Sequence, residues 1–240
     1  MCAFFMHCCR SMQASSNARS GSTMNQMIDV NQWGLRYALV AFRPNLDVSY
    51  RIVVIARSAN TQGAIGTRIS FRLGAGERYI TTIDLTNAPV LLEVSSQVLV
   101  AQTSIIEESR PVDAPACLMV PRLDYLPTTT YDVFVPTTAA TRTYITIVIQ
   151  DGLQNTLNVN RGSENVPVYA TWRQLTASNS ELYFAATLEF AGAGLFKVQS
   201  TRNDRLFVAT AYVHTDGGYT FSYAGKPSCK LLLRFAIVRL

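Results

Sequence analysis

Histidine is the residue type most often used as a general base, and this 240-residue chain contains only two. His7 lies near the N-terminus, and His214 lies two residues before Asp216, which opens an Asp-Gly-Gly turn. No Gly-x-Ser-x-Gly elbow, phosphate-binding loop or His-Glu-x-x-His pattern accompanies them. We therefore interpret His214 as a turn residue bonded to backbone, and we expect the protein not to be an enzyme.

Cys2, His7, Cys8 and Cys9 carry enough ligand atoms for a zinc ion, but their spacing does not suit one. Structural zinc sites usually pair ligands about two to four residues apart and need a second pair, whereas adjacent cysteines point apart. Reduced thiols are the simpler interpretation, and no metal or cofactor is predicted. The odd number of cysteines and the lack of any Asn-x-Ser/Thr sequon indicate assembly in a reducing, cytosolic environment.

Two glycine-containing stretches and one acidic loop could also carry chemistry. Residues 74–76 and 192–194 both read Gly-Ala-Gly and begin like dinucleotide-binding fingerprints, but both lack the third glycine, so we interpret them as turns. Glu107, Glu108 and Asp113 lie in a proline-containing segment and are interpreted as a solvated rim, with a glycosidase pair left open.

Arginine supplies 18 of the 21 cations, and this bias favours interfaces, because the guanidinium pairs with carboxylates or phosphates and stacks on aromatic rings. The cations are scattered singly, so charge alone does not indicate a nucleic-acid-binding patch. Only Tyr50-Arg51 and Phe71-Arg72 hint at a stacking platform for RNA bases, and core packing is the main interpretation of the aromatic residues.

The composition combines 48% hydrophobic residues with only 15% charged residues and a net charge of +5. Such a chain can form a sizeable core, and its low charge indicates that part of its surface is covered by other molecules. No apolar run is long enough to span a membrane.

The elements that would position these residues are almost all strands, because Thr, Val, Ile, Tyr and Phe alternate with polar residues between Gly, Pro, Asn and Asp. Residues 1–32 are predicted to form a polar N-terminal arm and residues 33–240 a single β-sandwich domain. Short helices are predicted at 24–28 and 34–42, loops at 60–66 and 107–129. The predicted strands are 48–57, 67–73, 79–84, 90–94, 97–105, 130–135, 143–150, 166–172, 180–190, 196–198, 205–213, 219–223 and 230–239.

Two stretches resemble picorna-like virus capsid proteins, as found in picornaviruses, dicistroviruses and iflaviruses. Residues 35–44 followed by 48–54 are similar to a short helix, an aromatic-Arg turn and a Tyr-Arg-hydrophobic strand, and residues 216–227 are similar to a late strand ending in Gly-x-Pro. The resemblance implies an all-β jelly roll of two antiparallel sheets and about eight core strands, with an irregular arm.

The same resemblance implies a structural coat subunit of an icosahedral positive-strand RNA virus, located in the virion and assembled in the host cytoplasm. Its partners would be other copies of itself, related capsid subunits and genomic RNA, with a host receptor left open. Arg10 and Arg19 would face the RNA, since the arm contains no acidic residue before Asp29.

The alternative is a cytosolic β-sandwich binding module, such as a lectin-like carbohydrate binder. That protein would be a monomer or small oligomer with a concave aromatic face, and an enzyme is the third hypothesis.

Overall fold

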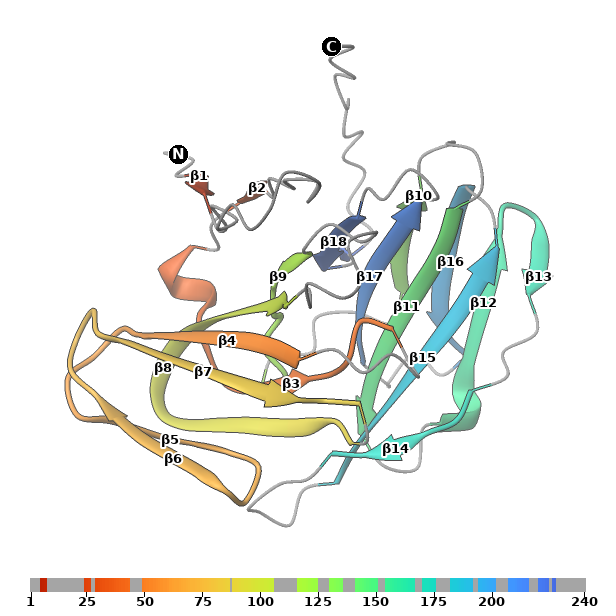
Figure 1. Cartoon of the computed structure of the whole chain (residues 1–240). Helices are drawn as coiled ribbons and strands as arrows, with labels where there is room; N and C mark the ends of the chain where they lie inside the picture. Colours follow the sequence, from red (N-terminus) through yellow and green to blue (C-terminus); the bar gives the residue numbers. More distant parts are fainter. Residues whose placement is uncertain are drawn as a thin grey trace.

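The described part of the chain is built almost entirely of antiparallel β-strands, so the predicted all-β sandwich is confirmed (Figure 1). Two 3-10 helices, η1 (Val30–Gln32) and η2 (Gln154–Thr156), complete the described elements. The computed structural model describes residues 5–7, 24–26, 29–43, 49–86, 88–105, 116–124, 130–135, 141–150, 154–166, 170–175, 182–191, 194–201, 207–215, 220–224 and 226–227.

The N-terminal half forms a seven-stranded sheet that curls around one long strand, β8. One half of β8 pairs with β3 and β5, and the other half pairs with β4 and β9, so the sheet bends back on itself. The main strand order is β6-β5-β8-β4-β7. The strands are β3 (Gly34–Leu39), β4 (Ser49–Ala56), β5 (Thr61–Ile65), β6 (Ile69–Leu73), β7 (Arg78–Asp84), β8 (Val90–Ser104) and β9 (Cys117–Met119).

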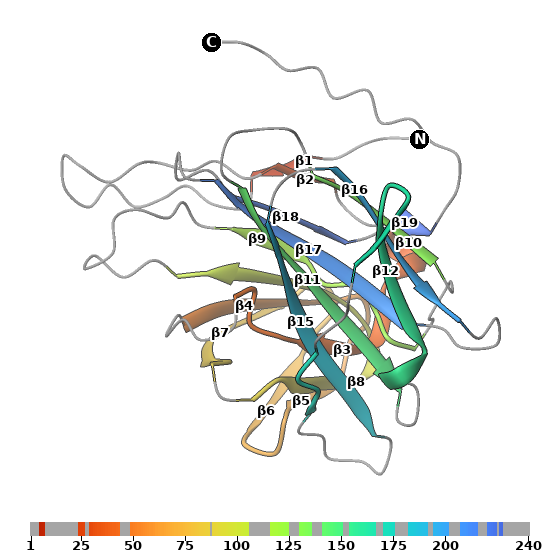
Figure 2. The same cartoon turned by 90° about the vertical axis from the view of Figure 1, so that its right-hand side faces the viewer.

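The C-terminal half forms two five-stranded sheets, in the orders β13-β12-β16-β10-β19 and β14-β15-β11-β17-β18. Figure 2 shows β15, β11, β17 and β18 lying side by side as one sheet. The strands are β10 (Thr130–Val135), β11 (Thr141–Gln150), β12 (Leu157–Arg161), β13 (Glu164–Val166), β14 (Arg173–Gln174), β15 (Tyr183–Ala191), β16 (Gly194–Ser200), β17 (Phe207–Thr215), β18 (Thr220–Ala224) and β19 (Lys226–Pro227).

Strand β11 is buried on both faces, and it thereby joins the two halves. Its odd-numbered residues Ile145, Ile147 and Ile149 pack between the two five-stranded sheets. The even-numbered Tyr144 and Val148 pack against residues of the N-terminal half instead. The described part is therefore a three-layer arrangement, with the curled sheet stacked on the outside of a sandwich.

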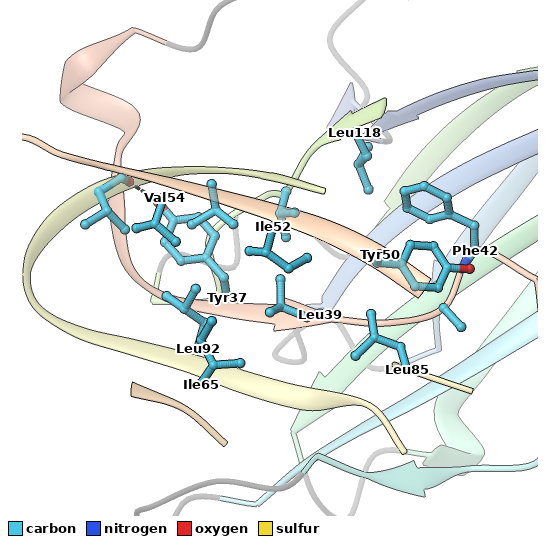
Figure 3. Packing of buried hydrophobic residues seen from close by; sticks show 14 of the residues in the cluster. Tyr37, Leu39, Phe42, Tyr50, Ile52, Val54, Ile65, Leu85, Leu92 and Leu118 are labelled. Atoms are coloured by element: carbon cyan, nitrogen blue, oxygen red, sulfur yellow. Dashed lines mark hydrogen bonds between the residues drawn. The ribbon is translucent and has the colours of Figure 1, made fainter. Parts of the chain in front are cut away.

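Aromatic rings hold the curled sheet and the sandwich together. Phe42 stacks on Tyr212 with ring centroids 5.6 Å apart and meets Tyr50 edge-on at 5.2 Å. The Tyr50 hydroxyl accepts a hydrogen bond from the Phe42 backbone N–H at 3.0 Å, which satisfies a buried polar group. Tyr37 lies deeper in the same core (Figure 3). Its hydroxyl accepts a hydrogen bond from the Gly34 N–H and donates one to the Val98 carbonyl.

Several predicted elements are wrong. Residues 34–42 were expected to be helical, but β3 occupies 34–39, because pairing with β8 and the Tyr37 hydrogen bonds outweigh the helix-like spacing. The predicted loop at 60–66 contains β5, and the strands predicted at 90–94 and 97–105 are one strand, β8.

Other differences lie toward the termini. The helix predicted at 24–28 is replaced over Met24–Gln26 by β2, which pairs with β1 (Phe5–His7). Of the strand predicted at 166–172, only Val166 lies in a described strand, and β12 was not predicted. The strand predicted at 230–239 lies outside the described residues, and the boundary between an arm and a domain at residue 33 stays a prediction.

Gly63 offers a test of the packing inside the curled sheet. A Cβ atom at this position would lie 2.3 Å from Cζ of Phe71 and 2.8 Å from Cγ1 of Val94. Gly63→Ala should therefore destabilise the protein by about 1–3 kcal/mol, measured by urea unfolding. In a Phe71→Ala background the same substitution should cost less than half as much, and an equal cost in both backgrounds would contradict this packing.

Tyr131 offers a test of burial in the sandwich. Desolvation raises the pKa of its hydroxyl, which lies in a side chain packed against the Phe207 ring. The folded state therefore keeps the proton when the unfolded chain loses it near pH 10, so stability is lost as the pH rises above that value. Tyr131→Phe should gain stability relative to the wild type between pH 9 and pH 11 in urea titrations. A constant difference across this range would contradict the assignment.

Candidate protein-binding surface

Most residues proposed from the sequence for chemistry or RNA contact lie outside the described residues, so their roles stay untested. This applies to Arg10 and Arg19, to the cysteines of the proposed zinc set, and to Glu107, Glu108 and Asp113. His214 lies in β17, where its backbone pairs with Arg142 of β11 and Thr220 of β18. Within the described ranges, no three His, Cys, Asp or Glu residues are grouped so that they could hold a metal ion.

The proposed stacking platform for RNA bases is not formed by Tyr50 and Arg51. Tyr50 is buried in the core of the curled sheet, whereas Arg51 lies on the opposite, exposed face of β4. Phe71 is partly buried and stacks on Tyr79 at 4.7 Å. Tyr50 therefore lies in the core of the curled sheet, and Phe71 packs against that core.

A small cavity of about 20 Å³ lies between the curled sheet and the sandwich. Its lining combines apolar side chains with Gln102, Thr146 and Thr210. Gln102 donates to the Val40 carbonyl at 2.7 Å, and the Thr146 hydroxyl lies 3.0 Å from that of Thr187. A space of this size accommodates about one water molecule and is too small for an organic ligand.

The exposed face of β4 and β7 has a different character, because apolar and cationic side chains alternate there. The register pairs Arg51 with Thr82, Val53 with Ile80 and Ile55 with Arg78. We define the β4–β7 surface by these residues, namely Arg51, Val53, Ile55, Arg78, Ile80 and Thr82.

Ile80 is the most unusual member of the β4–β7 surface, since 48% of this large apolar side chain is exposed. Val53 and Ile55 beside it are half-buried. An apolar centre of this kind, rimmed by polar residues, is typical of a surface that another protein covers.

Trp33 limits how far this apolar face extends. The indole packs on Leu99, Ala101 and Met119, which lie on β8 and β9 of the same sheet. Its carbonyl accepts a hydrogen bond from Nη1 of Arg122 at 3.1 Å, which fixes the segment in place. Val53 and Ile55 of β4 pack partly against the same cluster, so the chain itself covers the β8–β9 part of the face and the edge of the β4 part, and leaves Ile80 of β7 exposed.

Arg51 and Arg78 supply the charge of the β4–β7 surface. Within the described part of the chain, neither guanidinium makes a hydrogen bond or an ion pair. Arg142 differs, because it forms an ion pair with Glu189 at 3.3 Å. A guanidinium group presents several N–H donors in a planar arrangement that suits pairing with carboxylates.

Sequence reasoning missed Ile80, although one signal was present. The segment Arg78–Asp84 has large apolar side chains at both odd and even positions, namely Tyr79, Ile80 and Ile83. In a strand with only one buried face, apolar residues should occupy either the odd-numbered or the even-numbered positions, but not both. A large apolar residue such as Ile80 on the face turned away from the core therefore indicates that another molecule contacts this face.

The comparisons with known proteins give one match. A family model described as IgGFc binding protein matches residues 3–213, a range that includes both the curled sheet and most of the sandwich. The chain belongs to this family. No curated protein and no solved structure matches it.

Membership of the IgGFc-binding family overturns the resemblance to picorna-like capsid proteins. The predictions of a structural coat subunit, of capsid and RNA partners, and of a virion assembled in the host cytoplasm are therefore wrong. The first of the two stretches behind them contains a strand in place of the expected helix, and the second, 216–227, follows the matched range. The binding-module alternative is closer to the family.

None of the described helices is both long and apolar enough to cross a membrane.

Trp33 and Ile80, which lie at different places on this face, should differ sharply in their effect on stability. Trp33→Ala removes a ring that is only 9% exposed and should destabilise the protein by about 3 kcal/mol. Ile80→Thr keeps a β-branched side chain on an exposed strand and should change stability by less than about 0.5 kcal/mol. Thermal and urea unfolding of both variants would measure this, and a large loss in Ile80→Thr would show that Ile80 serves the fold.

Proposed function

We propose that the protein is a binding module for the Fc region of immunoglobulin G and that it performs no catalysis. The description of its family supports the choice of partner. The observation that supports the place of binding is the β4–β7 surface, where exposed Ile80 lies between two arginines that have no described partner. Since immunoglobulin G is an extracellular protein, binding would take place outside the cell.

The chemistry of the β4–β7 surface suits a folded protein better than a small molecule. The face presents side chains from two neighbouring strands and is not a cavity that could enclose a ligand. Arginine and apolar side chains are enriched where protein interfaces are fully desolvated. A specific interface uses roughly 20 to 30 residues on each side, so these six residues would form its centre.

Each part of the surface would contribute differently to binding. Ile80, with Val53 and Ile55, would lose its contact with water in the complex and so favour association. Arg51 and Arg78 would pair with carboxylates of the Fc region, which directs the approach of the two proteins and selects against cationic partners.

Binding of the full-length chain to an immobilised Fc fragment, measured by biolayer interferometry, tests the proposal. Ile80→Asp should weaken binding at least tenfold, because it places a charge at the apolar centre. Leu195→Asp is a matched control, since Leu195 is 50% exposed but lies on β16 in the outermost five-stranded sheet. No binding by the wild-type chain, or equal losses in the two variants, would contradict the proposal.

Charge reversal at the two arginines gives an independent readout. Arg51→Glu combined with Arg78→Glu should lower the association rate and weaken its dependence on salt, because the attraction to carboxylates is lost. The same kinetic measurement at low and high sodium chloride concentrations would show this. An unchanged salt dependence would mean that the arginines do not face the partner.

A further inference from the structure

The outer edge of β7 is the longest free strand edge in the described structure. The described edge strands are β1, β2, β3, β6, β7, β9, β13, β14, β18 and β19, and among these β7 is the longest with seven residues, followed by β3 with six. It contains no glycine or proline, and four consecutive residues, Ile80–Ile83, are isoleucine or threonine, which favour extended backbone. A long, regular edge of this kind is competent to pair with another strand.

The backbone groups that β7 presents at this edge can be identified from its pairing with β4. The Ala56 N–H donates to the Glu77 carbonyl at 3.0 Å, whereas Arg57 and Ser49 bond toward β8. Even-numbered residues of β4 therefore bond to β7, and their partners in register are Tyr79, Thr81 and Ile83. By the same alternation, the N–H and C=O groups of Arg78, Ile80 and Thr82 point away from β4, along the free edge.

These three residues also belong to the β4–β7 surface. A strand that paired with the free edge would therefore place its alternate side chains beside Arg78, Ile80 and Thr82, on the same exposed face. Backbone pairing and side-chain contact would then involve the same partner segment. An apolar side chain opposite Ile80 and a carboxylate near Arg78 would complement the face.

We infer that the partner is bound by strand addition, in which an extended segment of the Fc region pairs with the free edge of β7. The inference rests on the proposed function and specifies how the same surface recognises its partner. Immunoglobulin domains are antiparallel sandwiches with edge strands of their own, so they can supply a segment of this kind. The segment should combine apolar and acidic residues, because these would complement the exposed Ile80 and the positive charges of Arg51 and Arg78.

Thr82→Pro separates backbone pairing from side-chain contact. Proline removes the outward N–H of residue 82 and leaves the hydrogen bonds to β4 intact, which edge strands tolerate. Thr82→Ala is the control, because it shortens the side chain and keeps the N–H. Biolayer interferometry on the Fc fragment should show at least tenfold weaker binding for Thr82→Pro than for Thr82→Ala, since both variants lose the threonine side chain and only the proline variant loses the N–H.

A second pair of variants keeps the test decisive if Thr82→Pro unfolds. Arg78→Pro removes another outward N–H at the first residue of the strand, where proline is tolerated, and Arg78→Ala removes only the side chain. Weaker binding by Arg78→Pro than by Arg78→Ala supports strand addition. Circular dichroism and thermal unfolding of all four variants would establish which of them fold.

The outcomes distinguish this inference from the proposed function. Failure of the wild-type chain to bind Fc overturns both. Wild-type binding with equal affinities for the proline and alanine variants overturns strand addition alone. If sedimentation velocity shows that the wild type self-associates, that Thr82→Pro abolishes this and that Fc binding persists, the edge pairs with a second copy and the inference is wrong.

Discussion

The burial of β11 on both faces is the constraint on which the rest of the structure depends. A central strand with water on neither side must present apolar side chains in both directions, and β11 does so with Ile145 and Ile147 on one face and Tyr144 and Val148 on the other. The N-terminal half is therefore one layer of a shared core. Phe42 of the N-terminal half stacks on Tyr212 of the C-terminal half, and this contact fixes the position of the curled sheet against the sandwich.

This layering determines which surface is left for a partner. The curled sheet uses its concave side for its own core and part of its boundary for the contact with β11 and β17. Trp33 then covers the β8–β9 region of its outer face. Arg51 on β4 and the outer face and edge of β7 remain exposed, on the side of the molecule away from β10, β12 and β16 (Figure 1).

The fold class could be predicted from the sequence because alternation of apolar and polar residues is a local signal, and strands such as β6 and the second part of β16 follow it closely. The secondary structure of residues 34–39 could not be predicted, because the Tyr37 hydroxyl is held by a hydrogen bond to the Val98 carbonyl, which is distant in the sequence. The binding surface could not be predicted from local sequence patterns either. Ile80 can be recognised as part of a binding surface only when two features are known, namely its pairing with Val53 and the free edge of β7.

Hydrogen-deuterium exchange of the full chain, with and without saturating Fc fragment, tests the central claim most directly. The free edge of β7 presents outward N–H groups that exchange readily in the unbound protein. The account predicts that Fc slows exchange in peptides covering residues 78–84 and leaves peptides covering β16 unchanged. Unchanged exchange at 78–84, with protection confined to other strands, would contradict it.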